Sequence, residues 1–363
     1  MASYLSIRSK LLLLLMISGL AAALALSVIG YMRSDSALRA AVWDQLIAIR
    51  ETKKSDLSRY LESQERAFGV FAAEDQLGEA LPAFRAAYTG EAALPATSDK
   101  ADLLKYYSHT VMPKLPEGMR PLSPDTLLPE DTAGLRLQDR YIAKNPHPPG
   151  DRELLEEPIA AGGATNAYDE VHKRFHAHFL KMMQTMGMYD IFLIDDQTGE
   201  VLYSVEKEAD FATNLQTGPH RNSNLAQAYR TIRDRPDDQR GVVFIDFEHY
   251  LPSYGAPAAF LAAPIYVNGN KVGIVAGQLS IDALNASLTS SGKWEDEGLG
   301  KTGEVYLVGE DGYARSDSRF LVEDKPDYLK LLAELGVPQE QRDAIAMSGH
   351  SILNQHFSTS AVE

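Results

Sequence analysis

Residues 241–284 read GVVFIDFEHYLPSYGAPAAFLAAPIYVNGNKVGIVAGQLSIDAL, and this segment contains three runs that are rich in β-branched and aromatic side chains. The runs cover residues 242–247, 258–267 and 272–281. Asn268 and Gly269 join the last two runs, and both residue types tolerate the positive φ angles of a tight hairpin turn. The segment therefore predicts an antiparallel sheet.

The side chains of the last run alternate between the two faces of the predicted sheet. One face is apolar and carries Gly273, Val275, Gly277, Leu279 and Ile281. The other face begins apolar with Val272, Ile274 and Ala276 and becomes polar with Gln278, Ser280 and Asp282. A polar strand end beside an aromatic loop is typical of a small-molecule pocket, although a plain sheet edge gives the same pattern.

Five residues are candidates for lining this pocket. Asp246 lies near the end of the first run, Tyr250 and Tyr254 lie in the loop that follows it, and Gln278 and Asp282 project from the polar face of the last run. We expect the five to converge on one cavity. Each also has a structural explanation, because aspartates cap turns and helices, tyrosines cover sheet edges and a buried glutamine can be a hydrogen-bonded core amide.

Four segments resemble the extracytoplasmic sensor region of bacterial double Cache receptors. They are YDIFLIDDQTGEVLYSVEKEADFATNL from Tyr189, VVFIDFEHYLPSYGAPAAFLAAPIY from Val242, GIVAGQLSID from Gly273 and GKTGEVYLVGEDGYARSDSRF from Gly300. The resemblance implies PAS-like modules and a ligand-binding ectodomain. It also implies a cytoplasmic output, which in this family is a chemoreceptor signalling rod, a histidine kinase or a nucleotide cyclase.

The resemblance is incomplete in the pocket. In amino-acid-sensing members of the family, an arginine and an aromatic residue hold the ligand carboxylate, and a tyrosine with two aspartates holds the amine. Tyr254 matches the tyrosine, but Ala256 and Gln278 stand at the aspartate positions, and no Arg-x-Trp precedes the sheet. Without these carboxylates an ammonium group lacks its counter-charge, so a standard amino acid is not the expected ligand. Among the candidates we rank Tyr254 and Gln278 first, then Asp246, and interpret Asp282 as structural.

The composition excludes several classes of protein. The 363 residues are enough for about two domains, and 45% hydrophobic with 23% charged residues is typical of a folded chain. A net charge of -15 argues against non-specific nucleic-acid binding, which needs a basic surface. The absence of cysteine excludes disulfides, thiol catalysis and cysteine-ligated zinc or haem.

Residues 11–29 form an uninterrupted apolar run that is long enough to cross a bilayer as a helix. Arg8 and Lys10 precede it, so the positive-inside tendency places the N-terminus in the cytoplasm and the bulk of the chain outside. A cleaved signal peptide is the alternative, with residues 23–25 as its cleavage site. We favour an uncleaved single-pass anchor in the bacterial inner membrane.

Apolar residues recur at helical spacing from residue 34 to about residue 73. This pattern predicts one long amphipathic helix, either lying on its own sheet or serving as the stalk of a homodimer. The next segment, residues 88–164, is rich in proline. Half of the chain's 18 prolines lie in it, between Pro113 and Pro158. We interpret this segment as an ordered wrap, because Leu135, Tyr141 and Ile142 supply apolar anchors.

Helical spacing returns at residues 167–188, where His172 and His176 lie one turn apart. A second hypothesis is therefore a membrane-anchored, metal-dependent hydrolase that uses these histidines with Asp246 or Asp282. The sequence contains no nucleophile elbow, no P-loop and no complete metal motif. We therefore expect a sensor rather than an enzyme, with no catalytic residues, bound metal or cofactor.

Runs at 189–195 and 201–205 predict two further strands, and a helix is expected at 224–233 before the sheet segment, in PAS-like order. Residues 305–308 before Asp311 and Gly312 echo residues 191–195, which predicts a second module that is incomplete, as in a fragment or a natural truncation. The expected fold class is α+β. The predicted parts are a cytoplasmic N-terminus (1–10), a transmembrane helix (11–31), a stalk helix (32–87), the wrap (88–166), a membrane-distal module (167–290) and a partial membrane-proximal module (291–363).

Overall fold

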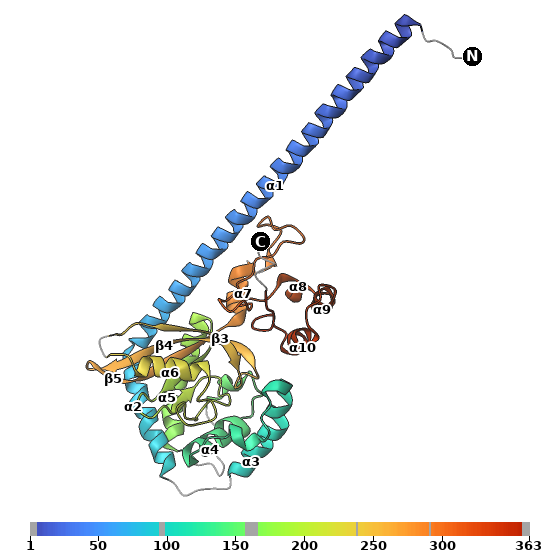
Figure 1. Cartoon of the computed structure of the whole chain (residues 1–363). Coiled ribbons are helices and arrows are strands. Elements are labelled where there is room, and N and C mark those ends of the chain that lie inside the picture. Colours follow the sequence, from blue (N-terminus) through green and yellow to red (C-terminus); the bar gives the residue numbers. More distant parts are fainter. Residues whose placement is uncertain (1–5, 94–98, 157–165, 237–238, 290–291, 358–363) are drawn as a thin grey trace. The chain divides into compact units, whose positions relative to one another are not determined.

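The computed structural model describes residues 6–93, 99–156, 166–236, 239–289 and 292–357. The chain divides into two compact units, residues 1–55 with 293–303 and residues 56–292 with 304–363 (Figure 1). The start of the predicted cytoplasmic N-terminus, parts of the predicted wrap and the predicted boundary at 290 fall outside the described residues.

The first unit is built on the N-terminal part of helix α1 (Ile7–Ala72). Within the described residues, α1 is the one helix long and apolar enough to cross a membrane, with a mean hydropathy of 2.6 over an 18-residue window, none of it buried. An N-terminal signal sequence passes the same test of length and composition. Residues 293–303 are joined to this helix by a hydrogen bond from Gln45 to the Gly298 carbonyl and by the Lys53–Glu297 ion pair.

The second unit begins where α1 meets the sheet. The range 32–87, predicted as one stalk helix, contains a break, because α1 ends at Ala72 and α2 (Asp75–Ala92) begins three residues later. The Glu74 backbone is extended between them. One core fully buries Phe68 and Phe71 on α1 together with Leu77 and Leu81 on α2. A single straight helix could not place both segments in this core, so the chain turns between them.

The second unit contains a five-stranded antiparallel sheet. Its strands are β1 (Met188–Ile194), β2 (Val201–Ser204), β3 (Val243–Tyr250), β4 (Ala256–Val267) and β5 (Asn270–Leu279), in the spatial order β2-β1-β5-β4-β3. Helix α6 (Asn224–Arg233) lies between β2 and β3 in the chain, as predicted. The α+β class and the PAS-like strand order are confirmed.

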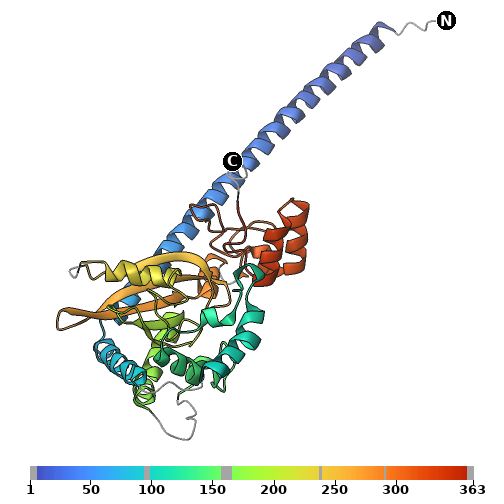
Figure 2. The same ribbon diagram turned by 60° about the horizontal axis from the view of Figure 1, so that its bottom comes forward.

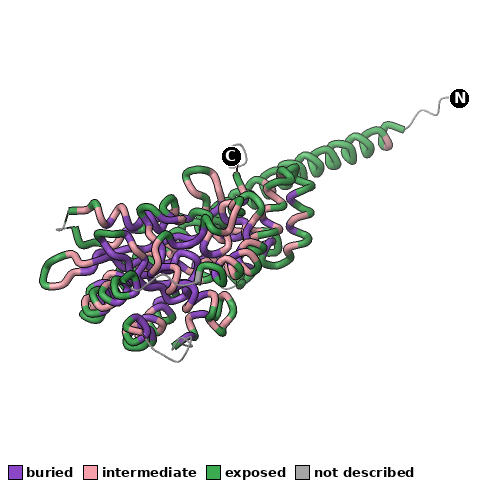
Figure 3. The backbone as a smooth tube through the Cα atoms, turned by 90° about the horizontal axis from the view of Figure 1, so that it is seen from below, coloured by how far each residue is buried: buried purple, intermediate pink, exposed green. Residues whose placement is uncertain are grey.

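Each face of the sheet is covered by helices. Val275 and Leu279 face a core that contains residues of α1, α2 and α5 (Ala167–Met186), whereas Ile274 and Ala276 face α6, so the predicted alternation of β5 is confirmed. Figure 2 shows α6, in yellow, lying along the sheet. A Cβ atom at Gly273 would overlap Leu81, and the glycine therefore lets α2 approach closely. Buried residues concentrate in these layers, while the N-terminal part of α1 is exposed (Figure 3).

The proline-rich segment is ordered wherever the structure describes it. It forms α3 (Asp99–Tyr106), α4 (Thr132–Gln138) and six short 3-10 or π segments, at Tyr107–Val111, Met112–Lys114, Glu117–Met119, Pro124–Leu127, Asp139–Ala143 and Arg152–Leu154. The fully buried Gln138 accepts a hydrogen bond from Tyr107 and donates to the carbonyls of Ala209 and Phe211. These bonds fix the wrap to the segment that follows β2.

The C-terminal part carries helices α7 (Ile281–Thr289), α8 (Arg319–Glu323), α9 (Lys325–Glu334) and α10 (Gln339–Ser348). The strand predicted at 305–308 is reduced to an isolated bridge between Val308 and Ala314. A second isolated bridge joins Tyr313 to His356, so three chain segments meet here through single bridges, and none of the described residues extends these bridges into strands. The local pattern was therefore insufficient to form a ladder.

Candidate ligand-binding site

A cavity of about 180 Å³ lies where β5 ends and α7 begins. The lining residues come from four separate parts of the chain: Tyr189, Ser253, Ala256, Pro257, Gln278, Leu279, Ser280, Ile281, Asp282 and His350. The volume matches roughly six water molecules at the ~30 Å³ that each occupies in the liquid. It is therefore large enough for a small metabolite.

Gln278 is the most informative residue of this cavity. Its side chain comes from the penultimate position of β5 and is only 4% exposed. The amide nitrogen donates to the Ser253 hydroxyl at 3.3 Å, but the oxygen Oε1 has no hydrogen-bond partner among the described residues. A buried acceptor without a partner costs about 1–3 kcal/mol, and a donor from a bound molecule or an ordered water would remove this cost.

A buried carboxyl group supports the polar wall of the cavity. Ser253 and Tyr189 both donate to Glu208, at 2.5 and 2.9 Å. Burial, together with the nearby Asp210, raises the pKa of Glu208 to about 8, although both hydroxyls lower it. Glu208 therefore fixes two lining side chains and exchanges a proton close to physiological pH.

Glu208 belongs to a cluster of buried ionisable residues that follow β2. Asp190 on β1 is fully buried and accepts hydrogen bonds from the amides of Val205 and Glu206 and from the Ser204 hydroxyl. Burial, reinforced by Asp190, raises the pKa of Glu206 to about 9.

Lys207 is the cation within this cluster. It is fully buried at a positive φ of 54°, and its ammonium group donates to the carbonyls of Ser204 and Val205. Burial lowers the pKa of Lys207 to about 7, against the opposing effect of Asp190 and Glu206. Burial therefore raises the pKa of the acids behind the cavity and lowers that of Lys207.

Arg152 reaches the same cluster from the wrap. It is 3% exposed, donates to the Lys207 carbonyl at 3.0 Å and lies with its guanidinium carbon 5.2 Å from the centre of the Tyr106 ring. Burial lowers the pKa of Arg152, while nearby Tyr254 and Glu208 raise it. Arg152 thus contacts the buried cluster from the wrap and does not itself line the cavity.

The structure brings two of the five predicted site residues to the cavity and separates the other three from it. Gln278 and Asp282 line the cavity. Tyr250 is fully buried and donates to Asp210, and Tyr254, at a φ of 57°, lies beneath the Lys114 ammonium group at 5.0 Å. Asp246 is exposed on the edge strand β3 and pairs with Arg315 at 3.1 Å. The expected convergence of all five residues is therefore not what the fold produces.

Three lining or supporting residues were missed by the sequence reasoning. Tyr189 is the first residue of the strand predicted at 189–195, and the alternation of side chains along that strand was the available signal. Glu208 lies in a charged stretch that resembles an ordinary loop. His350 comes from a segment 68 positions after Asp282, and no sequence pattern connects it with the pocket.

The histidine pair of the hydrolase hypothesis lies inside the helical core. His172 and His176 on α5 are 0% and 2% exposed, and their rings stack with centroids 4.3 Å apart. Both nitrogens of His176 are engaged, with the Tyr203 hydroxyl and the Glu153 carbonyl. Burial and the Lys207 charge lower the pKa of His176 to about 3. Among the described residues, no group of three His, Asp or Glu side chains is arranged to hold a metal.

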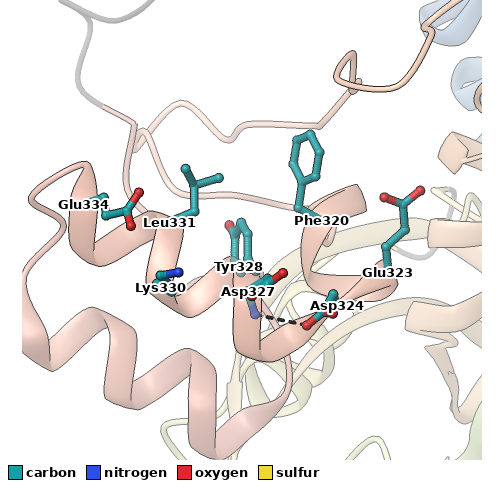
Figure 4. Close-up of a pocket in the computed structure, with 8 residues that line it drawn as sticks. All are labelled: Phe320, Glu323, Asp324, Asp327, Tyr328, Lys330, Leu331 and Glu334. Carbon is teal, nitrogen blue, oxygen red and sulfur yellow. Dashed lines mark hydrogen bonds between the residues drawn. The ribbon is translucent and has the colours of Figure 1, made fainter.

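A second hollow, of about 360 Å³, lies on α8 and α9 (Figure 4). Its acidic residues Glu323, Asp324, Asp327 and Glu334 are exposed, and Asp324 caps α9 by accepting the Asp327 amide. No buried polar atom without a partner faces this hollow among the described residues. It is therefore an ordinary solvated surface.

No family model and no curated protein matches the chain. Among solved structures, the chain is similar to the ligand-binding domain of the Pseudomonas fluorescens chemoreceptor CtaA in complex with L-serine, with 18% identity over 40% of this chain and 52% of that chain and a TM-score of 0.26. It is also similar to the ligand-binding domain of the Pseudomonas aeruginosa PAO1 amino acid chemoreceptor PctC in complex with GABA, with 16% identity over 41% and 57% of the two chains and a TM-score of 0.26. The sensor domain of the V. cholerae histidine kinase DctB matches with 10% identity over 49% and 57% and a TM-score of 0.28.

The match spans about half the length of each of these structures. All three are sensor domains of chemoreceptors or of a histidine kinase. At TM-scores this low, the similarities do not define a ligand, an output or an assembly for this chain.

Proposed function

We propose that this chain is the ligand-sensing part of a membrane-anchored bacterial signal-transduction receptor. In this proposal, a small molecule binds in the cavity at the end of β5, and a cytoplasmic output outside this chain responds. The observation that carries the proposal is Gln278, whose buried Oε1 has no partner among the described residues and belongs to a side chain that lines a cavity. Such an acceptor is unfavourable in the empty cavity and becomes satisfied when a donor binds.

Two further observations support the proposal. The PAS-like strand order agrees with the resemblance to double Cache sensors, although fold alone does not determine function. In the hydrolase hypothesis, His176 uses both ring nitrogens in core hydrogen bonds, His172 stacks on its ring, and no third metal ligand stands beside them among the described residues. A binding module therefore explains the geometry better than an enzyme.

Ligand binding can be tested with a thermal-shift screen of metabolites, followed by titration of each hit. Gln278→Leu is expected to lower the affinity for a genuine ligand about 5- to 150-fold, because the loss of one buried hydrogen bond costs about 1–3 kcal/mol. The matched control is Glu248→Gln, which changes an exposed side chain on the edge strand β3 and should leave affinity unchanged. If Gln278→Leu binds the ligand as tightly as Glu248→Gln does, and both variants keep the melting temperature of the parent protein, the binding site lies elsewhere.

The proposed receptor also requires α1 to anchor the chain in the membrane, with the residues beyond the apolar run outside the cytoplasm. We further propose that two chains pair through this helix. Large apolar side chains on its N-terminal part are exposed, including Leu38 at 65%, Val42 at 47% and Leu46 at 40%. Val42 and Asp44 are two residues apart and therefore lie roughly 200° apart around the helix. Only the Val42 side belongs to the apolar stripe.

The chain has no cysteine, so cysteines introduced at these two positions report directly on pairing and on sidedness. In spheroplasts, a membrane-impermeant bis-maleimide is expected to cross-link Val42→Cys into dimers several times more than Asp44→Cys. Cross-linking only by a permeant reagent would contradict the orientation. Equal yields at both positions would contradict the pairing face.

A further inference from the structure

His350 brings the C-terminal part of the chain into the cavity. It lies two residues after α10 and lines the same cavity as Gln278 and Asp282. Its side chain is 27% exposed, so the ring lies in the wall of the cavity with access to solvent. This residue is the one side chain in the lining that carries a positive charge when protonated.

The ring of His350 is held in one orientation by Asp317. Its Nδ1 lies 2.8 Å from Oδ2 of Asp317, whose side chain is 6% exposed. The same oxygen accepts from Asn285 on α7, and the other carboxylate oxygen accepts from the Ser351 amide. Among the described residues, Nδ1 makes the only side-chain hydrogen bond of His350, which leaves Nε2 available to a bound molecule.

The charged surroundings favour the imidazolium form. The hydrogen bond to Asp317 raises the pKa of His350, and the charges of Asp317 and Asp282 act in the same direction, against burial and Lys325 on α9. The other titratable groups on the cavity side are Tyr189 and, behind it, Glu208. A protonated His350 with Nδ1 bonded to a carboxylate donates its second N–H from Nε2.

We propose that His350 is the residue of this cavity that binds the acidic group of a ligand, so that ligand binding is linked to protonation of its ring. This inference rests on the proposed function. The ligand class follows from two side chains that line one small cavity, His350 with its available Nε2 and Gln278 with its unpartnered Oε1. A small carboxylate that carries a hydrogen-bond donor on the adjacent carbon satisfies both.

The adjacent donor can be a hydroxyl or an ammonium group. The sequence predicts no counter-charge for an ammonium group at Ala256 or Gln278, but Asp282 places a carboxylate in the lining of the cavity, so both donors are tested. Glycolate and glycine are therefore the two probes, and both fit within about 180 Å³. Glycolamide is the matched neutral control, because it keeps the hydroxyl and the size but lacks the carboxylate. Binding of glycolate alone or of glycine alone supports the inference and identifies the donor.

The experiment is isothermal titration calorimetry of the full chain in detergent between pH 5.5 and 8. We expect at least one probe to bind at millimolar concentration at low pH, and affinity to fall by up to tenfold for each pH unit above the pKa of His350. Titrations in buffers of different ionisation enthalpy should show net proton uptake on binding in that range. His350→Gln should weaken binding tenfold or more at pH 5.5 and remove the pH dependence.

Glu208 also titrates in this range, so Glu208→Gln distinguishes the two groups. If the pH dependence persists in Glu208→Gln and disappears in His350→Gln, the inference is supported. It is overturned if His350→Gln binds as tightly as the parent, if glycolamide binds as well as glycolate, or if neither probe binds. A ligand from the metabolite screen that depends on Gln278 but not on His350 would overturn this inference and leave the proposed function intact.

Discussion

Replacement of Asp190 by alanine is expected to destabilise the sheet unit by about 2–6 kcal/mol. Two buried donors, the Glu206 amide and the Ser204 hydroxyl, would lose their acceptor, and each such loss costs about 1–3 kcal/mol. The Val205 amide is less affected, because it also donates to the Ile191 carbonyl. The same bonds hold the segment that carries Glu208, so the ligand response should be lost with the stability.

The measurement is urea unfolding followed by circular dichroism. Tryptophan fluorescence is unsuitable, because both tryptophans, Trp43 and Trp294, belong to the other unit. Asp190→Asn is the control, since it keeps an acceptor oxygen and the side-chain volume and should cost clearly less. An alanine variant as stable as the asparagine variant would show that the acceptor role of Asp190 does not stabilise the fold.

The second large effect depends on pH. Glu206 is 7% exposed, and its pKa rises from 4.5 to about 9 on folding, mainly through burial and then through Asp190. A carboxyl group with a raised pKa stabilises the folded state fully below pH 4.5, and this contribution is lost as pH rises towards 9. The loss is at most about 1.4 kcal/mol for each pH unit.

Glu206→Gln cannot ionise and should therefore gain stability relative to the parent as pH rises. Between pH 5 and pH 8 we expect the difference in unfolding free energy to move by about 2–4 kcal/mol in favour of the variant. Lys207, whose pKa falls to about 7, has the opposite pH dependence, but it is present in both proteins and largely cancels in the difference. A difference that is flat with pH would show that Glu206 is ionised and solvated in the folded protein.

Much of the sheet was predictable because its determinants are local. Asn268 and Gly269 adopt φ angles of 51° and 83° at the hairpin, and α6 has the predicted bounds. The alternation along β5 correctly separated the two cores. By contrast, the helical pattern ends near residue 73, close to the end of α1 at Ala72, but no helix-breaking residue at Ala73 or Glu74 signals that a separate helix α2 follows.

The candidate site was less predictable because its residues are far apart in sequence. Gln278 was found through strand alternation, a local property. His350 and Arg152 reach the site region through packing of the C-terminal part and of the wrap, and neither has a motif. Asp246 was predicted to line the pocket but lies on the exposed side of β3, away from this cavity, because a polar residue at alternating positions in a strand marks an exposed face as readily as a pocket.

The ion pair between Asp246 and Arg315 has a consequence for solubility. Strand β3 is an edge of the sheet, and its outward residues include Phe244, which is 39% exposed. An open edge with apolar side chains invites a strand of another molecule, and such contacts lead to aggregation. Asp246 and Glu248 place negative charges along this edge, and Arg315 covers part of it from the C-terminal segment. The residue first considered as a ligand contact thus protects the sheet from pairing with its own copies.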